Sequence, residues 1–302
     1  TIKSILGSDF EIIASVGHIN QVENDNNSIS ITDHKLNINW ISDEKKHKNI
    51  LSTIKKYKPN NIIIATDMDR EGEAIGWHLY NLIRDNNILD NKIPISINRI
   101  TFVEITKKAV TQALSQQRDL DQNLINAYLT RLTLDFKIGF ELSPILWKKL
   151  WVLKNQSAGR VQSPALGIIV ENEYKRSIFI PEIYYNHNLV LKYKNNITFQ
   201  GEIEEYYGEK MTNFMKDKNK LDQILSTLGD KLYVLNIKNT VVNYSAPEPL
   251  ITTSLQQEAS NKLGFNVQKT MQLAQQLYEG IDINGKPQAL ITYMRTDSKN
   301  MS

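Results

Sequence analysis

The pattern of hydrophobic and polar positions in the first third of the chain predicts an α/β arrangement. A run of isoleucines within Asn61 to Thr66 is typical of a strand buried on both faces. Apolar residues at helical spacing precede it over Ile50 to Tyr57 and follow it over Ala74 to Ile83. A short strand is also predicted over Glu11 to Val16. The expected order is therefore helix, strand, acidic turn and helix.

The middle of the chain changes from helices to strands. Leu120 to Lys175 has helical spacing, which we expect Leu142-Ser143-Pro144 to interrupt because proline removes a backbone donor. Alternation predicts strands over Tyr184 to Tyr207 and over Leu232 to Tyr244. A helix is predicted between them, over Asn213 to Leu228.

The last part of the chain predicts two helices and a strand. The helices are Thr253 to Lys262 and Val267 to Glu279. Gly264 suits the residue just past the end of the first helix, and Asn266 suits the N-cap of the second. Ala289 to Arg295 reads as a final short strand.

Length and composition narrow the class of protein. The chain has 302 residues, with 36 Lys plus Arg, 33 Asp plus Glu and no cysteine. This length suits about two domains, and the missing cysteine excludes disulfides, thiolate metal sites and a cysteine nucleophile. The net charge of +3 is weak evidence for an acidic partner. Apolar runs are far shorter than the ~20 residues of a membrane span, and no signal peptide is visible. Polar or proline-containing stretches mark candidate boundaries between parts of the chain, at Asn24 to Ser28, Asp85 to Pro94, Pro181 and Ala246 to Pro249.

Three carboxylates follow the isoleucine strand directly. Asp67 and Asp69 are two positions apart at an extended end, and Glu71 opens the next helix. Ligands bind beyond the carboxyl ends of strands in open α/β sheets, and clustered carboxylates raise one another's pKa unless a cation compensates. Hard oxygen ligands favour magnesium, and phosphate oxygens can fill the remaining positions of its coordination shell. The alternative is that these residues only favour the helix dipole.

One further pattern suits contact with phosphate, and it has a structural alternative. Ser157 to Pro164 is small, flexible and cationic, and its Arg160 and Gln162 suit a nucleic-acid backbone. The same stretch also fits an ordinary helix start with an exposed arginine. Arg131 and Asp135 are four positions apart and share a helical face, and by themselves they predict a surface ion pair.

The last predicted strand carries a candidate nucleophile. Alternation places Ile291, Tyr293 and Arg295 on one face. A phenol with a pKa of about 10 is a poor nucleophile at neutral pH, but a neighbouring guanidinium would stabilise the phenolate and a transferring phosphate. The alternative is a structural tyrosine, because the chain has 13 tyrosines.

Taken together and in this order, the segments resemble type IA DNA topoisomerases of the bacterial topoisomerase I kind. The resemblance runs from residue 15 to the end, and the acidic and tyrosine segments together are its most specific part. The matching segments are Ser15–Ile19, Ala65–Ile75, Leu142–Lys149, Ser157–Pro164, Ser254–Ala259 and Ile291–Ser298.

This resemblance implies a catalytic set. Tyr293 matches the nucleophile that joins a 5′ phosphate of single-stranded DNA, and Arg295 matches its catalytic partner. Arg131 and Asp135 match a helix pair that holds the strand near the cleavage site. Glu71 belongs to the same set.

The resemblance also implies binding roles. Asp67, Asp69 and Glu71 match the acidic triplet of a Toprim domain, which would hold Mg²⁺. The matching DNA-contacting positions are His18, Lys148, Ser157, Gly159, Arg160, Gln162 and Arg295.

The implied fold is multidomain α/β plus α, with a Toprim-like parallel sheet, a helical lobe, a β arch segment and a winged-helix-like lobe bearing Tyr293. We expect these parts at residues 1–119, 120–177, 178–244 and 245–302. The family has a strand with a Glu and a Lys ahead of Thr1, and it continues past Ser302. We therefore expect a truncated chain that is inactive in relaxation by itself. Leu132 and Phe136 stand where the family often has arginine, which removes positive charge from the expected DNA groove.

The implied activity is relaxation of negatively supercoiled DNA. It would proceed without ATP, through transient single-strand cleavage, a 5′-phosphotyrosine intermediate, strand passage and religation. The expected partner is a single-stranded region of DNA, with no membrane, a monomeric state and a cytoplasmic, nucleoid-associated location if the source is bacterial. One alternative is another Toprim phosphoryl-transfer enzyme, a primase or nuclease, which would leave Tyr293 and Arg295 unexplained. Another is a non-catalytic DNA-binding protein, whose binding would not need magnesium.

Overall fold

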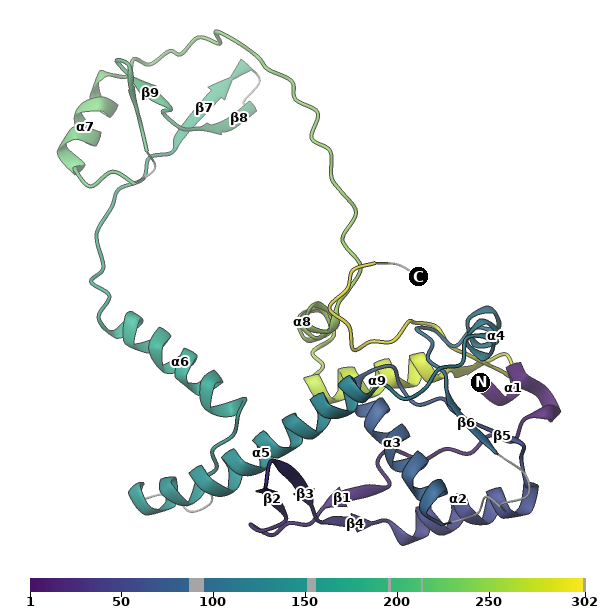
Figure 1. Ribbon diagram of the computed structural model, residues 1–302. Coiled ribbons are helices and arrows are strands. Elements are labelled where there is room, and N and C mark those ends of the chain that lie inside the picture. The colour runs from purple at the N-terminus through teal and green to yellow at the C-terminus, as the bar shows by residue number, and fades with distance from the viewer. Residues whose placement is uncertain (87–94, 151–155, 195–196, 213, 301–302) are drawn as a thin grey trace. The chain divides into compact units, whose positions relative to one another are not determined.

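The computed structural model describes residues 1–86, 95–150, 156–194, 197–212 and 214–300, and the chain forms two units. The larger unit holds residues 1–164 and 246–302, and the smaller unit holds residues 165–245 (Figure 1). The division into four parts that the sequence predicts stays a prediction.

A parallel strand pair lies in the larger unit. Strand β5 (Asn61–Ile64) pairs with β6 (Ser96–Arg99), and helix α3 (Arg70–Asp85) comes between them in the chain. Helix α2 (Glu44–Tyr57) precedes β5. These elements share a core of five buried residues, Ile19, Ile50, Ile54, Leu82 and Ile83. The expected strand, acidic turn and helix of a Toprim-like fold are confirmed, and both predicted helices begin earlier than expected.

Short elements surround this pair. Helix α1 (Ile2–Leu6) and the 3-10 helix η1 (Gly7–Asp9) begin the chain. Antiparallel pairs join β1 (Asn20–Val22) to β4 (Trp40–Ser42) and β2 (Ile29–Thr32) to β3 (Lys35–Ile38). The polar loop expected at Asn24 to Ser28 connects β1 to β2.

A second core in the larger unit holds the tyrosine segment. Helices α4 (Lys107–Ser115), α8 (Thr252–Leu263) and α9 (Val267–Glu279) contribute to it, and the hairpin of β11 (Ile281–Ile283) and β12 (Lys286–Gln288) follows α9. Both predicted caps are confirmed. Gly264 ends α8 at a φ of 66°, and the Asn266 side chain accepts the Lys269 N–H at 2.8 Å. The buried members of the core are Ile105, Val110, Ala274, Tyr278, Tyr293 and Met294.

Helix α5 (Gln122–Lys149) corrects one prediction, because it runs through Pro144 without interruption. Proline fixes φ near the helical value and removes one hydrogen bond. The Leu150 N–H still reaches the Leu146 carbonyl at 2.8 Å, so a single missing bond does not end this long helix. Among the described residues, no helix is long and apolar enough to cross a membrane.

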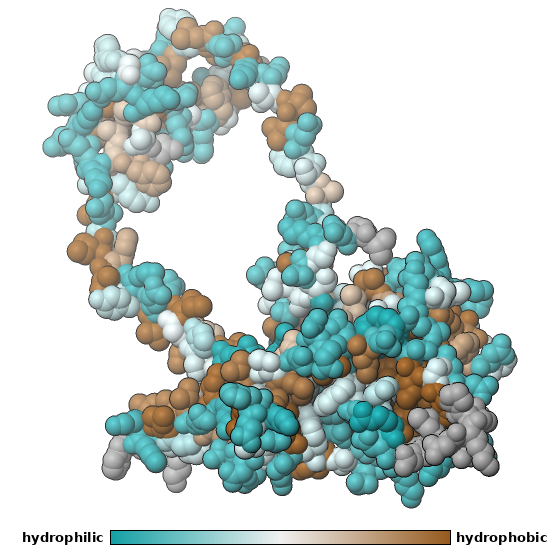
Figure 2. Space-filling model, viewed as in Figure 1, coloured by the Kyte–Doolittle hydropathy of each residue, from teal (hydrophilic) through white to brown (hydrophobic). Residues whose placement is uncertain are grey.

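Apolar side chains are exposed along the end of α5 and along α6 (Gln162–Ser177). Figure 2 shows hydrophobic atoms at the surface of both helices. The exposed residues include Leu142, Ile145, Trp147, Leu166, Ile168, Ile169 and Tyr174.

The smaller unit contains most of helix α6, two antiparallel strand pairs and helix α7 (Lys218–Thr227). Strand β7 (Leu189–Tyr193) pairs with β8 (Ile197–Gly201), and β9 (Glu205–Tyr206) pairs with β10 (Glu209–Lys210). The strands expected over Tyr184 to Tyr207 are therefore confirmed in part. Helix α7 is shorter than predicted because Asp217 caps it, accepting the Lys220 N–H at 3.1 Å.

Three predicted strands are wrong. Glu11 to Val16, Leu232 to Tyr244 and Ala289 to Arg295 have no strand in the described structure. Alternation describes which side chains could share a face, but a strand also needs a neighbour to pair with, and the described residues supply none at these places. Most of the predicted boundary Asp85 to Pro94 lies outside the described residues, as does Asn213.

Candidate active site

The acidic turn between β5 and α3 has a shape that its own residues impose. Asp69 is the N-cap of α3, and its Oδ1 accepts the Gly72 N–H at 2.8 Å. A Cβ on Gly72 would lie 2.1 Å from the Asp67 carbonyl oxygen, so only glycine allows this close approach. The Thr66 hydroxyl donates to the Gly72 carbonyl at 2.5 Å and closes the turn. The turn is therefore held by local hydrogen bonds before any ligand is considered.

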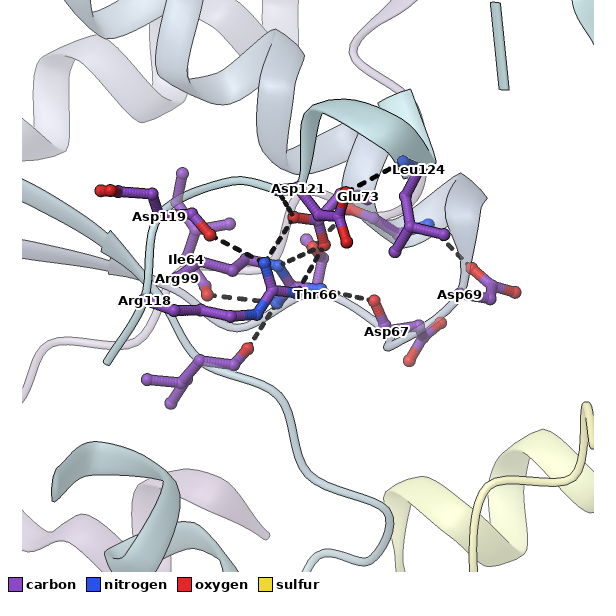
Figure 3. A network of polar contacts seen from close by, with 12 residues as sticks. Ile64, Thr66, Asp67, Asp69, Glu73, Arg99, Arg118, Asp119, Asp121 and Leu124 are labelled. Atoms are coloured by element: carbon purple, nitrogen blue, oxygen red, sulfur yellow. Dashed lines mark hydrogen bonds and ion pairs between the residues drawn. The ribbon is translucent and has the colours of Figure 1, made fainter. Parts of the chain in front are cut away.

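A buried cluster of charges lies behind the turn (Figure 3). The side chains of Glu73 and Arg99 are both fully buried, and Arg99 Nε donates to Glu73 Oε2 at 3.0 Å. Arg118 donates to both oxygens of Glu73, at 2.9 and 3.0 Å, and the Asp121 N–H donates at 2.7 Å. Burial alone would raise the pKa of Glu73, but these donors together lower it below its usual value. Glu73 is thus an ionised, fully paired carboxylate in the interior.

This cluster fixes the backbone that carries the acidic turn. Arg99 Nη2 donates to the Asp67 carbonyl at 2.6 Å, and Nη1 donates to the Ile64 carbonyl at 3.2 Å. Asp121 is also the N-cap of α5. The end of β5, the turn and the start of α5 are therefore joined through one pair of buried side chains. Sequence reasoning missed this cluster, since Arg99 and Arg118 carry no local signal of their buried partner.

The segment that carries Tyr293 contacts the acidic turn, although this segment does not form the predicted strand. Tyr293 Oη donates to Asp69 Oδ2 at 2.7 Å. Arg295 Nη1 lies 3.4 Å from the same oxygen and 2.9 Å from Glu71 Oε2. The two predicted partners thus both reach Asp69, as a shared strand face would have placed them.

Tyr293 is held in place on several sides. Its side chain belongs to the second core, the residue is 3% exposed, and its backbone N–H donates to the Val103 carbonyl at 2.8 Å. The ring of Tyr278 packs edge-on against it at 5.3 Å between centroids. Burial raises the pKa of Tyr293, and the hydrogen bond to Asp69 adds to the rise. The hydroxyl is therefore a neutral phenol in this state.

Asp67 stands apart from these contacts, and its electrostatics suit a cation. Burial raises the pKa of Asp67, the neighbouring Asp69 adds to the rise, and Arg295 opposes it. A divalent cation beside these oxygens would relieve both the burial and the repulsion. Among the described residues, no group of three His, Cys, Asp or Glu side chains is already arranged to hold a metal ion. The donor chemistry of the turn fits magnesium, but Asp69 and Glu71 here bind Tyr293 and Arg295.

A hollow of about 470 Å³ opens beside the turn. It combines two carboxylates with three guanidinium groups, which suits a phosphate. The lining residues are Asp69, Arg70, Glu71, Leu124, Arg131 and Arg295.

The predicted helix pair is part of a larger set. Asp135 lies 3.5 Å from Arg131 and 2.7 Å from Arg160, so one carboxylate joins α5 to the turn that begins α6. The hydrogen bond from Arg160 and the charges of both arginines lower the pKa of Asp135. Gln162 Nε2 donates to the Ser157 carbonyl and hydroxyl, at 2.8 and 3.0 Å, across Gly159.

His18 lies near the acidic turn, whereas Lys148 is elsewhere. The His18 ring stacks on Tyr128 of α5 at 5.6 Å between centroids. Burial lowers the pKa of His18, against the opposing charges of Glu71 and Asp69, so the ring is neutral at pH 7. Lys148 is exposed near the end of α5 and does not line the hollow. Sequence reasoning also missed Tyr128 and Tyr278, which stand in ordinary helical positions.

Comparison with known proteins adds a second line of evidence. The family described as DNA topoisomerase matches residues 119–302, and the Toprim domain matches residues 1–105. The DNA topoisomerase 1 of Rickettsia bellii (strain RML369-C) is 41% identical to this chain, covering 100% of the chain and 38% of that protein. The DNA topoisomerase 1 of Zymomonas mobilis is 39% identical, covering 100% of the chain and 24% of that protein.

A solved structure is similar as well. Full-length topoisomerase I from Thermotoga maritima matches with a TM-score of 0.76 at 36% identity, covering 100% of this chain and 48% of that one. The chain thus spans less than half the length of each of these relatives.

Proposed function

The chain belongs to the type IA DNA topoisomerase family, and from this premise we propose that its protein relaxes negatively supercoiled DNA through a transient single-strand break. The substrate is a single-stranded region of DNA, and no ATP is consumed. The protein acts as a monomer in the bacterial cytoplasm, at the nucleoid.

The observation that carries this proposal is the meeting of Tyr293, Arg295 and the acidic turn. A hydroxyl, a guanidinium and two carboxylates from segments 224 residues apart lie within hydrogen-bond distance of one another. The cationic hollow beside them supplies a place for a phosphate. A merely structural tyrosine would not need to share a carboxylate oxygen with an arginine that lines such a hollow.

The proposed cleavage step uses Tyr293 as the nucleophile. Its Oη forms a bond to phosphorus, the bond from phosphorus to the 3′ oxygen breaks, the phenol gives up a proton and the 3′ oxygen gains one. Arg295 stabilises the negative charge on the phosphate. Religation reverses these changes, and the phosphotyrosine keeps the energy of the phosphodiester.

The remaining predicted residues hold the strand. Arg131, Asp135 and Arg160 form one charged set beside the hollow. We propose that Arg131 contacts phosphate and that Asp135 orients both arginines. Ser157, Gly159 and Gln162 shape the turn that presents Arg160, while His18 and Lys148 contact the strand at either side.

Asp67, Asp69 and Glu71 would hold Mg²⁺ with their carboxylate oxygens. When bound, the ion supplies positive charge that orients the 3′ hydroxyl and the phosphate for religation. Glu71 Oε2 accepts from Arg295 Nη1 in the structure, and this oxygen would be shared between the guanidinium and the ion.

A covalent adduct tests the proposed function. Full-length protein is mixed with a 3′-labelled single-stranded oligonucleotide and quenched in denaturant. Labelled DNA attached to protein through its 5′ phosphate supports the proposal. A nuclease or primase would release free DNA ends or extend a primer, and a non-catalytic binding protein would leave the DNA intact, so either result contradicts it.

Removing two carboxylates should abolish magnesium-dependent religation. In Asp67→Ala with Glu71→Ala, Asp69 still contacts Tyr293, so cleavage persists and the adduct accumulates. The affinity for Mn²⁺, measured by electron paramagnetic resonance, should also fall in this double variant. The matched control removes Glu171 and Glu173 from the exposed face of α6 and should change neither readout. Unchanged religation and Mn²⁺ binding in the first variant would remove the metal role.

The 302-residue chain should bind single-stranded DNA with an affinity that falls as the salt concentration rises. Displaced counterions drive phosphate contacts, so log K should fall linearly with log salt, by ~0.7 per contacted phosphate. Lys148 has no ion-pair partner among the described residues, so Lys148→Gln should reduce that slope by ~0.7. Lys220→Gln on α7 is the control. An unchanged slope would exclude Lys148 from the interface.

A further inference from the structure

The carboxylate of Asp69 performs two tasks at once. Its Oδ1 accepts the Gly72 N–H at 2.8 Å and so caps helix α3. Its Oδ2 accepts the Tyr293 hydroxyl at 2.7 Å. One oxygen is thus anchored to a helix end, and the other is presented to the nucleophile in a fixed position.

The rest of Tyr293 has little freedom. The ring is buried in a core, contacts Tyr278 at 5.3 Å, and its backbone is tied to Val103. What the core does not determine is the direction of the O–H bond, and with it the direction of the oxygen lone pairs. Attack on phosphorus requires a lone pair that faces the phosphorus in line with the leaving group. The hydrogen bond to Asp69 sets that direction.

We propose that Asp69 positions the Tyr293 hydroxyl for attack, and that it does so without any metal ion. This inference rests on the proposed function, because it assigns a role within the same cleavage step. It separates Asp69 from Asp67, which has no contact with Tyr293 among those the structure describes. The acidic turn then has two roles: Asp69 orients the Tyr293 hydroxyl, and the three carboxylates of the turn together bind the cation.

Cleavage measured in EDTA separates these two roles. EDTA removes divalent cations, so an effect of Asp69 on the cleavage rate cannot then come from metal binding. The full-length protein is mixed with the labelled oligonucleotide in EDTA, and the rate of adduct formation is measured at saturating DNA. Asp69→Asn keeps the size of the side chain and the helix cap, since Asn caps as well as Asp. It replaces a charge-assisted hydrogen bond with a weaker neutral one. The expected fall in rate is about tenfold, equivalent to ~1.4 kcal/mol in the barrier.

A second variant and a control complete the test. Asp69→Ser also caps a helix but is too short to reach the hydroxyl, so its rate should fall further. Asp217→Asn makes the same change at the N-cap of α7 in the other unit and should leave the rate unchanged. The oligonucleotide concentration at half saturation should stay the same in all three variants, which a general structural defect would not allow.

The outcomes distinguish the two proposals. If the wild type forms the adduct and Asp69→Asn forms it equally fast in EDTA, Asp69 does not position Tyr293, and the proposed function stands. If the wild type forms no adduct with or without magnesium, both are overturned. A fall in the rate at saturating DNA, with an unchanged oligonucleotide concentration at half saturation, supports the positioning role.

Discussion

Tyr293→Phe is expected to abolish the covalent adduct with DNA and to leave the protein folded. The substitution keeps the ring, its buried surface and its contact with Tyr278, and removes the hydroxyl that donates to Asp69. The lost hydrogen bond to a charged carboxylate costs about 1.5–3 kcal/mol of stability, whereas the loss of the attacking oxygen leaves nothing to bond to phosphorus. The measurement is the denaturant-quenched adduct on a 3′-labelled single strand, beside the thermal unfolding midpoint.

Two further variants define the specificity of this result. Tyr278→Phe makes the same chemical change in the adjacent ring, whose hydroxyl donates weakly to the Phe102 carbonyl at 3.4 Å, and the adduct should still form. Arg295→Ala should slow cleavage about 10²–10³-fold without abolishing it, by analogy with the loss of one oxyanion donor. An adduct that persists in Tyr293→Phe, or that is joined through a 3′ phosphate, would contradict the assignment of the nucleophile.

Glu73→Ala should destabilise the larger unit strongly. It leaves Arg99 fully buried with no carboxylate beside it, and removing one partner of a buried ion pair costs about 3–5 kcal/mol. The free energy of unfolding is measured by urea titration, with fluorescence of Trp40 and Trp77, which both lie in the larger unit. Glu171→Ala on exposed α6 breaks a solvated pair with Lys175 and should cost no more than about 1 kcal/mol. An equally small loss for Glu73→Ala would refute the structural role of the cluster.

The buried cluster around Glu73 should also make the free energy of unfolding depend on pH. The donors around Glu73 lower its pKa, so its contribution is fully present above the ordinary glutamate pKa. It is lost as the pH falls through the lowered value, because the folded state must then accept a proton that weakens the pair. In the Glu73→Ala variant this part of the acid sensitivity should disappear.

The sequence by itself determined the local elements of this protein. The isoleucine run, the glycine after α8 and the asparagine before α9 each act on their immediate neighbours, so their structure follows from short-range sterics and capping. The acidic turn belongs here too, since Asp69 and Gly72 are three positions apart and close the turn between themselves. Tyr293 and Arg295 could be proposed as a site from their resemblance to a family, although nothing local separates this tyrosine from the others.

Tertiary structure decided the rest. Tyr293 lies 224 residues from Asp69 in the chain, and only the packing of α9 and its following segment brings them together. The same segment was expected as a strand, but without a neighbouring strand to pair with it is irregular. Val103 holds it through one backbone hydrogen bond, and Thr252 holds it through hydrogen bonds to Met294 and Thr296. Glu73 looks like any helical glutamate until two distant arginines close around it. Contacts of this kind depend on loop closure and burial across the whole unit, and no short window of the sequence carries that information.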